Sequence, residues 1–502
     1  MGDKLPASSQ RKTSVVRVRG VFFIVIVACV TVVAGWVITA QGARQAGSAN
    51  RPISNNRVAS HSTIPQDVYV GYKDTVYRLS GQNGSIVWKQ ALVQPSKMNR
   101  ISGSSMQVQV MSSNLICVQL ENTVFVLDSS SGKQLWQYAV HLTPAQQRET
   151  RAYIGSVVFD QQRVYIYLAT GELLGFDIQS GKQLWQGPRF PNGVSLSAAD
   201  GMIYAKSTNA QGHPVLYAVD GTTGSFLWHF QPQMWGNTSF DAPLVADGVV
   251  YDAGNPLYAL DARTGKQLWE QPLSDRASFF TNLHLLNGRL YADTSAAVAS
   301  VGTVGKQPTM PALYRVYAFD VQSGKMLWQS QAGDRQLLVD ANAIAVLASA
   351  DKVDSQSLQL LDPVSGALRW QTTLRTPVCD SEHLCGQPPV AHIADGKLVL
   401  LDNGGQAYAL RVLDLQSGKQ LSQYPVSLPF KEGLGESVLS NGRLYVKTGV
   451  HGGGQYSSGS SNTFWNYNLY AIDLTGGQTA WHYQIGKLLE YQDPIAPLVL
   501  AP

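Results

Sequence analysis

The sequence predicts an all-β chain, a β-propeller of four-stranded antiparallel blades, preceded by one transmembrane helix. Three observations predict this fold: a short signature that recurs at constant internal spacing, a composition rich in Gly and Trp, and one uncharged apolar run near the N-terminus. Charged residues make up only 14% of the chain, against about 25% in ordinary soluble domains. At 502 residues the chain exceeds one ordinary domain, so a repeat architecture is favoured.

Residues 20–40 (GVFFIVIVACVTVVAGWVITA) carry no charged side chain and match the roughly 20 residues that span a bilayer as a helix. Residues 1–19 carry five basic side chains and one acidic one, so the positive-inside tendency places them in the cytoplasm. The alternative is a cleaved signal peptide. Its apolar core is usually about 7 to 15 residues long and precedes a small-residue cleavage site, which is absent here. We expect a retained single-pass anchor in the cell membrane.

Residues 41–66 are rich in Ser, Asn, Gln and Ala and lack periodicity, which predicts a flexible linker between the membrane and the propeller of residues 67–502. After residue 19 the chain holds 33 basic and 33 acidic residues. Nucleic-acid binding needs a basic patch that displaces counterions from phosphate. No such stripe is visible, so nucleic acid is not an expected partner.

The repeated signature is an apolar strand, Asp, three residues, Gly, three residues and Trp. Successive signature glycines are 41 to 59 residues apart, so rigid hairpins alternate with variable connections. The complete copies are Asp128, Gly132 and Trp136; Asp177, Gly181 and Trp185; Asp220, Gly224 and Trp228; Asp261, Gly265 and Trp269; Asp320, Gly324 and Trp328; Asp362, Gly366 and Trp370; and Asp473, Gly477 and Trp481. Two copies are degenerate: Asp414, Gly418 and Ser422, and Ser80, Gly84 and Trp88.

Each signature predicts a strand, a tight turn and a second strand. The Asp carboxylate can accept backbone N–H bonds as an Asx-turn, and Gly adopts positive φ without a Cβ clash. The Trp is expected to fill the space between neighbouring sheets, with its indole N–H requiring a partner. Calcium binding by the recurring aspartates is the alternative, and eight copies at one turn position favour the structural role.

Two further strand-like runs precede each signature, as in DAPLVADGVVYDA before LYALDARTGKQLW. Four strands per unit of about 40 to 50 residues are typical of propeller blades. The C-terminal DPIAPLVLAP resembles the first strand of a blade, whereas DVYVGYKDTVYRLSGQNGSIVWKQ at the start supplies only three strands. We therefore expect the last strand to complete the first blade and leave no open edge. This count gives nine blades.

The pattern A-x-D-x-x-(T/S)-G-x-x-x-W, present as YALDARTGKQLW and YAFDVQSGKMLW, resembles the PQQ-type repeat of quinoprotein alcohol dehydrogenases and of outer-membrane assembly lipoprotein propellers. The resemblance covers residues 67–502 and implies eight blades, with one signature, most simply the first, outside a complete blade. It also implies two functions. One is a non-enzymatic binding or assembly scaffold, and the other is a membrane-bound dehydrogenase that oxidises alcohols or sugars with PQQ and calcium.

The sequence favours the scaffold. Relatives that use PQQ carry adjacent cysteines beside the quinone, and this chain has no such pair. It also lacks the Cys-x-x-Cys-His, His-Glu-x-x-His, Gly-x-Ser-x-Gly and phosphate-loop motifs. No catalytic residue and no metal ligand are nominated, and no cofactor is expected. Assembly lipoproteins carry a lipidated Cys after a signal peptide, whereas Cys29 lies within the predicted span.

Cys379 and Cys385 bracket the segment CDSEHLC and are predicted to form a disulfide outside the cytoplasm. A metal site with His383 is the alternative, but three ligands fall short of the usual four of zinc. Cys117 lies in a strand-like segment and is expected to be a buried free thiol.

Long insertions occupy residues 141–151, 295–312, 379–385 and 451–468. If the strands of a blade run outward from the axis, all four insertions share the face opposite the signature turns, and repeat proteins build binding surfaces from such insertions. We expect this loop-rich face to bind an envelope protein, cell-wall material or a small ligand. The best-placed aromatic anchors are Tyr456, Phe464, Trp465 and Tyr467. The alternative is that these aromatics pack on their own blade.

Overall fold

A computed structural model describes the chain over residues 65–93, 106–140, 154–232, 239, 241–274, 278–296, 315–330, 336–349, 355–375, 390–403, 407–428, 432–455, 461–488 and 498–502. The predicted tail, transmembrane helix and linker of residues 1–64 lie outside these ranges. Within them, no helix has the length and apolar character needed to cross a membrane.

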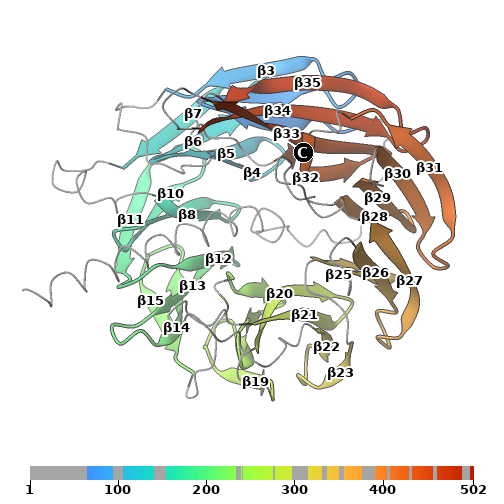
Figure 1. The fold of residues 1–502 in the computed structure, drawn as a ribbon. Helices are drawn as coiled ribbons and strands as arrows, with labels where there is room; N and C mark the ends of the chain where they lie inside the picture. The colour runs from blue at the N-terminus through green and yellow to red at the C-terminus, as the bar shows by residue number, and fades with distance from the viewer. Residues whose placement is uncertain are drawn as a thin grey trace, which may run out of the picture. The chain divides into compact units, whose positions relative to one another are not determined.

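The described residues form nine four-stranded antiparallel sheets, one for each signature. Figure 1 shows the sheets following one another as the blades of a propeller. Listed from inner to outer strand, blade one is β36 (Val499–Leu500), β1 (Val68–Tyr72), β2 (Thr75–Leu79) and β3 (Ile86–Ala91). Blade two is β4 (Met106–Val110), β5 (Leu115–Leu120), β6 (Thr123–Asp128) and β7 (Gln134–Ala139). Blade three is β8 (Ile154–Phe159), β9 (Arg163–Leu168), β10 (Glu172–Asp177) and β11 (Gln183–Arg189).

The next three blades continue in the same order. Blade four is β12 (Ser195–Ala199), β13 (Met202–Thr208), β14 (Pro214–Asp220) and β15 (Phe226–Phe230). Blade five is β16 (Leu244–Ala246), β17 (Val249–Asp252), β18 (Leu257–Asp261) and β19 (Gln267–Gln271). Blade six is β20 (Ser278–Leu286), β21 (Arg289–Ala296), β22 (Val316–Asp320) and β23 (Met326–Gln329).

Three blades complete the described ring. Blade seven is β24 (Gln336–Asp340), β25 (Ala343–Ser349), β26 (Ser355–Leu361) and β27 (Leu368–Arg375). Blade eight is β28 (Val390–Ala394), β29 (Lys397–Asn403), β30 (Tyr408–Asp414) and β31 (Gln420–Val426). Blade nine is β32 (Glu432–Ser440), β33 (Arg443–Gln455), β34 (Ser461–Asp473) and β35 (Thr479–Leu488).

The expectation of eight blades, which came from the family resemblance, is wrong for this chain. The first signature does form a complete sheet, because the C-terminal β36 pairs with β1 through Val68 with Leu500 and Tyr69 with Val499. The Ala501 backbone N–H adds a bond of 2.8 Å to the Asp67 carbonyl. The prediction that the last strand completes the first blade is confirmed, and the count of nine follows from it.

The hydrophobic core is divided among the interfaces between blades. The described residues form nine apolar clusters, and each cluster combines side chains from two successive blades, including the ninth and the first. Val, Leu and Ile alternate along the middle strands, so each sheet contributes one apolar face to either neighbour. The ring is therefore stabilised one interface at a time.

Candidate functional site

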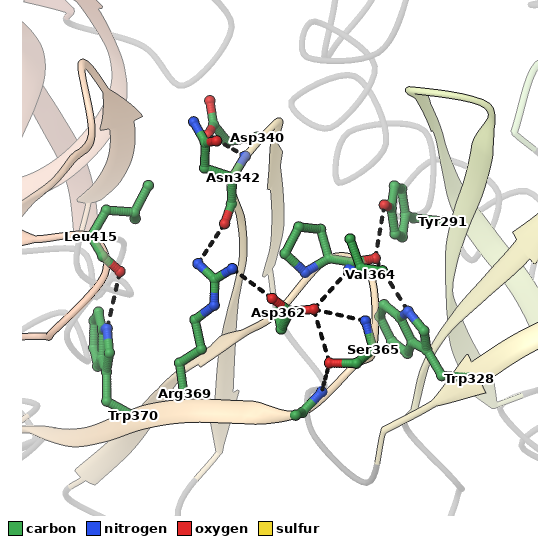
Figure 2. A network of polar contacts seen from close by, with 12 residues as sticks. Tyr291, Trp328, Asp340, Asn342, Asp362, Val364, Ser365, Arg369, Trp370 and Leu415 are labelled. Atoms are coloured by element: carbon green, nitrogen blue, oxygen red, sulfur yellow. Dashed lines mark hydrogen bonds and ion pairs between the residues drawn. The ribbon is translucent and has the colours of Figure 1, made fainter.

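The signature turn of blade seven shows what the recurring aspartate does (Figure 2). The Asp362 Oδ1 accepts the Val364 N–H at 3.0 Å, the Ser365 N–H at 2.7 Å and the Ser365 hydroxyl at 2.8 Å. The Gly366 N–H donates to the Asp362 carbonyl at 2.8 Å, and Gly366 has a φ of 71°. This is an Asx-turn, in which the carboxylate replaces a backbone acceptor. The Arg369 guanidinium donates to the second carboxylate oxygen at 2.6 Å.

These hydrogen bonds keep the signature carboxylates ionised. The Ser130 and Ser131 hydroxyls lower the pKa of Asp128 to about 2. Hydrogen bonds within the turn lower the pKa of Asp177, Asp220, Asp261, Asp320 and Asp414, which hold the same position in other blades. The pKa of Asp362 is lowered first by the hydrogen bond from Arg369 and then by those of its turn. In blades two to eight each signature carboxylate accepts hydrogen bonds inside its own turn. Among the described residues, no group of three or more His, Cys, Asp or Glu side chains could hold a metal ion.

The signature Trp connects a blade to the next one at eight of the nine interfaces. The Trp328 indole N–H donates to the Pro363 carbonyl of blade seven at 3.2 Å, and Trp370 donates to the Leu415 carbonyl of blade eight at 3.1 Å (Figure 2). The ring plane covers the signature glycine of that next blade: a Cβ on Gly366 would lie 2.5 Å from Trp328. Glycine is therefore required both for its positive φ and for the close approach of the indole.

A tyrosine in the second strand shares this acceptor, and the sequence signature does not include it. The Tyr291 hydroxyl donates to the Pro363 carbonyl at 3.1 Å, beside the Trp328 indole. Tyr69 and Trp88 likewise both donate to the Ser129 carbonyl. A carbonyl has two lone pairs, so one oxygen can satisfy both buried donors. An apolar residue followed by Tyr recurs early in the second strand of the blades, and this sequence pattern could have identified the tyrosines.

The loop-rich face lies opposite the signature turns, because successive strands of every blade are antiparallel. Most of the predicted site residues on this face lie outside the described residues: Tyr456, the pair Cys379 and Cys385, and the insertions at 141–151 and 297–312. Phe464 and Trp465 lie in β34, where Trp465 pairs with His451 and with Leu488. Tyr467 is half-buried and packs against the apolar cluster shared by blades nine and one.

The structure describes residues 451–455 and 461–468 of the predicted insertion, and these residues lie in β33 and β34. β33 and β34 continue as a hairpin out to Gln455 and Ser461, because their backbone groups go on pairing with each other. β32 accompanies this hairpin as far as Val450, and β35 accompanies it as far as Trp465. The residue pairs from Gly452 with Phe464 to Gln455 with Ser461 therefore form a two-stranded arm. At about 3.3 Å per residue, this arm extends roughly 13 Å beyond the neighbouring strands. We call the paired residues 452–455 and 461–464 the blade-nine arm.

The sequence of the blade-nine arm carries no charged side chain, and among the described residues no strand pairs with its two outer edges. No Asp, Glu, Lys or Arg occurs between Lys447 and Asp473. Natural edge strands are usually protected by charge, proline or a bulge, since unpaired N–H and C=O groups otherwise pair with another chain. Neither a proline nor a register shift interrupts the pairing of β33 with β34. The arm therefore has the backbone chemistry of a surface that can add a strand from a partner.

The polar groups near the inner strands pair with one another. Lys206 Nζ, which is buried, lies 2.6 Å from the Asp252 carboxylate of the next blade. Lys447 Nζ lies 3.0 Å from Glu436, whose carboxylate also accepts the Leu498 N–H at 3.1 Å. These contacts neutralise charge that would be costly to leave unpaired at such depth. Their geometry connects strands and blades to one another.

The model of one protein family, described as outer membrane protein assembly factor BamB, matches residues 44–230 and 212–483 of this chain. These matches span nearly all nine blades. The chain belongs to this BamB family. The resemblance to PQQ-type repeat propellers, drawn from the signature alone, is thereby confirmed.

Individual members and neighbours of the BamB family are distant from this chain. The outer membrane protein assembly factor BamB of Yersinia pestis is 24% identical over 279 residues, which cover 55% of this chain and 61% of that protein. The polyvinylalcohol dehydrogenase of a Sphingopyxis species is 22% identical over 376 residues, covering 61% of this chain and 55% of that protein. The matches therefore leave more than a third of each relative uncovered.

Solved structures support the fold. The crystal structure of a eukaryotic initiation factor matches with a TM-score of 0.54 at 10% identity, and the match covers 87% of this chain and 99% of that chain. At this identity the likeness concerns the fold alone.

Proposed function

We propose that this chain is a non-enzymatic scaffold of the cell envelope, which binds other proteins through its loop-rich face. The observation that carries the proposal is the blade-nine arm, an uncharged two-stranded extension whose outer edges pair with no other strand in the described part of the chain. Membership of the BamB family supports the assignment, because the relatives are named as outer membrane protein assembly factors. We propose that residues 20–40 anchor the chain in the membrane and that the linker of residues 41–66 lets the loop-rich face reach its partners.

The arm suits a partner that presents an unpaired strand. Main-chain hydrogen bonds supply affinity when a strand is added to an open sheet edge, and side chains at alternate positions supply specificity. Phe464, Trp465 and Tyr456 remain our candidates for such specificity contacts. The predicted disulfide of Cys379 and Cys385 would brace a neighbouring insertion of the same face.

Site-specific photo-crosslinking tests this proposal in cells that express the full chain. A photoreactive residue at Gln455 or Ser461 places the probe on the arm, whereas one at Thr222 or Gln322 places it in the signature turns of the opposite face. We expect discrete crosslinked protein bands from the arm positions and none from the turn positions. Equal patterns from both faces would contradict a docking role for the loop-rich face.

Shortening the arm provides the matched loss-of-function test. Deleting residues 452–454 together with 462–464 removes three paired rows and preserves the remaining register. We expect the crosslinked partner to be lost while the thermal unfolding midpoint of the propeller stays unchanged. A PQQ titration of the full chain with calcium, followed by dye-linked alcohol oxidation, tests the enzymatic alternative: stoichiometric binding with turnover would contradict the scaffold assignment.

A further inference from the structure

One of the nine blade interfaces lacks the tryptophan contact. Eight interfaces carry a bond from an indole N–H to a backbone carbonyl of the next blade, at 2.9 to 3.2 Å. Between blades eight and nine the position belongs to Ser422, which pairs with Val412 as Trp370 pairs with Leu360. The turn itself is intact, since Asp414 accepts the Ser417 N–H at 2.8 Å. Only the indole is missing.

A different side chain covers the glycine of blade nine. Tyr424, two residues beyond Ser422, lies over Gly477, and a Cβ built there would meet the Tyr424 Cβ at 2.1 Å. At this interface the backbone and Cβ of Tyr424 therefore contact the glycine of the next blade directly. At the other interfaces an indole ring lies between the two blades. Among the hydrogen bonds of the described residues, none joins Ser422 or Tyr424 to the Leu474 carbonyl, which corresponds to the indole acceptor of the other interfaces.

The inner half of this interface is packed normally. Twelve buried residues from blades eight and nine form its apolar cluster, which includes Leu401, Leu410 and Leu444. His392 of β28 and Ser437 of β32 add a hydrogen bond of 2.8 Å between the inner strands. The deficit is confined to the outer half, where β31 faces the signature turn of blade nine.

The following interface, between blades nine and one, is reinforced at the same level. The Trp481 indole and the Tyr445 hydroxyl both donate to the Gly81 carbonyl, at 3.1 and 3.3 Å. Arg443 donates to the Gln82 carbonyl at 2.9 Å and also bonds the Asp473 carboxylate of its own blade. Blade nine is thus held firmly on one side and weakly, at its outer edge, on the other.

We infer that the ring opens first at the outer half of the interface between blades eight and nine. Interfaces with an indole lose a large aromatic contact and a hydrogen bond on opening, whereas this one loses apolar contacts of smaller side chains, among them Tyr424, Val426 and Leu474, and no indole hydrogen bond. Opening here lets the ring widen while the other eight interfaces hold. The blade-nine arm is part of blade nine, which stays attached to blade one when this interface opens, so the arm moves together with blades nine and one. This inference is independent of the proposed function.

Amide hydrogen exchange of the full chain tests the inference with internal controls. Every signature turn contains the same bond, from the Gly N–H to the backbone carbonyl four residues earlier, at 2.8 Å in both the Gly366 and the Gly477 turns. These amides differ in whether an indole covers them. After correction for intrinsic rates, we expect Gly477 to exchange at least fivefold faster than Gly366. A ratio below fivefold would overturn the inference.

Two variants link the exchange rate to the indole. Trp370→Ser removes the indole that covers Gly418, and it should raise exchange at Gly418 at least fivefold while Gly366 stays unchanged. If that variant fails to fold, Ser422→Trp supplies the missing side chain and should slow exchange at Gly477 at least fivefold. Failure of the applicable variant to change the rate at its own turn would show that the indole does not control opening.

Discussion

The Trp328 indole and the Tyr291 hydroxyl, both from blade six, donate to the same carbonyl oxygen of Pro363 in blade seven, at 3.2 and 3.1 Å. One backbone atom thus receives two buried donors from the neighbouring sheet. The arrangement recurs where Tyr69 and Trp88 meet Ser129. The interface depends on aromatic packing and on hydrogen bonds that satisfy polar groups within it.

Replacing Trp328 separates these two contributions. Trp328→Phe keeps an aromatic ring but loses one donor to Pro363, so we expect a loss of about 1 kcal/mol in the free energy of unfolding. Trp328→Ala also leaves a cavity over Gly366 and should cost about 3–5 kcal/mol. Denaturant titration monitored by circular dichroism measures both. Equal losses from the two substitutions would show that packing contributes little at this interface.

Asp362 and Arg369 are expected to differ in importance although they form an ion pair. The pair is partly solvent-exposed, so Arg369→Ala should lower the free energy of unfolding by less than about 1 kcal/mol. Asp362→Ala removes the acceptor of two backbone N–H groups and of the Ser365 hydroxyl, and we expect a larger loss of about 1–2 kcal/mol. Thermal unfolding of the two variants side by side checks the order. The reverse order would mean that the guanidinium, rather than the Asx-turn, stabilises this hairpin.

Acid should destabilise the propeller in a defined pH range. The signature carboxylates of blades two to eight have pKa values lowered by hydrogen bonds, and the pKa of Asp128 is about 2. A carboxylate with a lowered pKa in the folded state stabilises the fold above its unfolded pKa of about 3.9, and this stabilisation is lost as the pH falls toward the folded value. We expect the unfolding midpoint to be steady from pH 7 to pH 5 and to fall between about pH 4 and pH 2. A midpoint that is already falling above pH 5 would indicate other groups.

Cys117 should be chemically inert in the folded protein. The thiol is buried, and this burial raises its pKa to about 12, so almost no thiolate exists at neutral pH. Treatment with iodoacetamide at pH 8, followed by peptide mass spectrometry, should leave Cys117 unmodified until denaturant is added. Rapid labelling of the native chain would show that blade two opens readily.

The closing strand should be essential for a soluble ring. Removing residues 498–502 deletes β36, exposes the edge of β1 and ends the bond from the Gln66 side chain to the Ala501 carbonyl. An unpaired β1 edge can pair with another chain, so we expect a lower unfolding midpoint and higher oligomers on size-exclusion chromatography. Removing Pro502 alone is the control and should change neither property. A monomeric truncated chain of unchanged stability would contradict the role of closure.

The sequence by itself determined the repeat, its turn and its closure, because these depend on contacts close along the chain or on strand counting. Eight Asp and Gly pairs at one spacing, together with the degenerate copy of Ser80 and Gly84, predicted nine turns and nine blades. The family resemblance predicted eight blades. This number was taken from the relatives, and it carried no information on how the C-terminal strand of this chain pairs.

Only the tertiary structure decided the features that depend on neighbours distant in sequence. Tyr291 has no local signal for its hydroxyl partner, since Pro363 lies in the next blade. In the sequence, Ser422 is only a degenerate position of the repeat. The structure places it in the interface with the Gly477 turn, and this interface therefore lacks an indole. Residues 451–468 were predicted as an insertion, and the structure pairs residues 451–455 of β33 with 461–465 of β34, because backbone hydrogen bonds between two strands do not require strand-forming side chains.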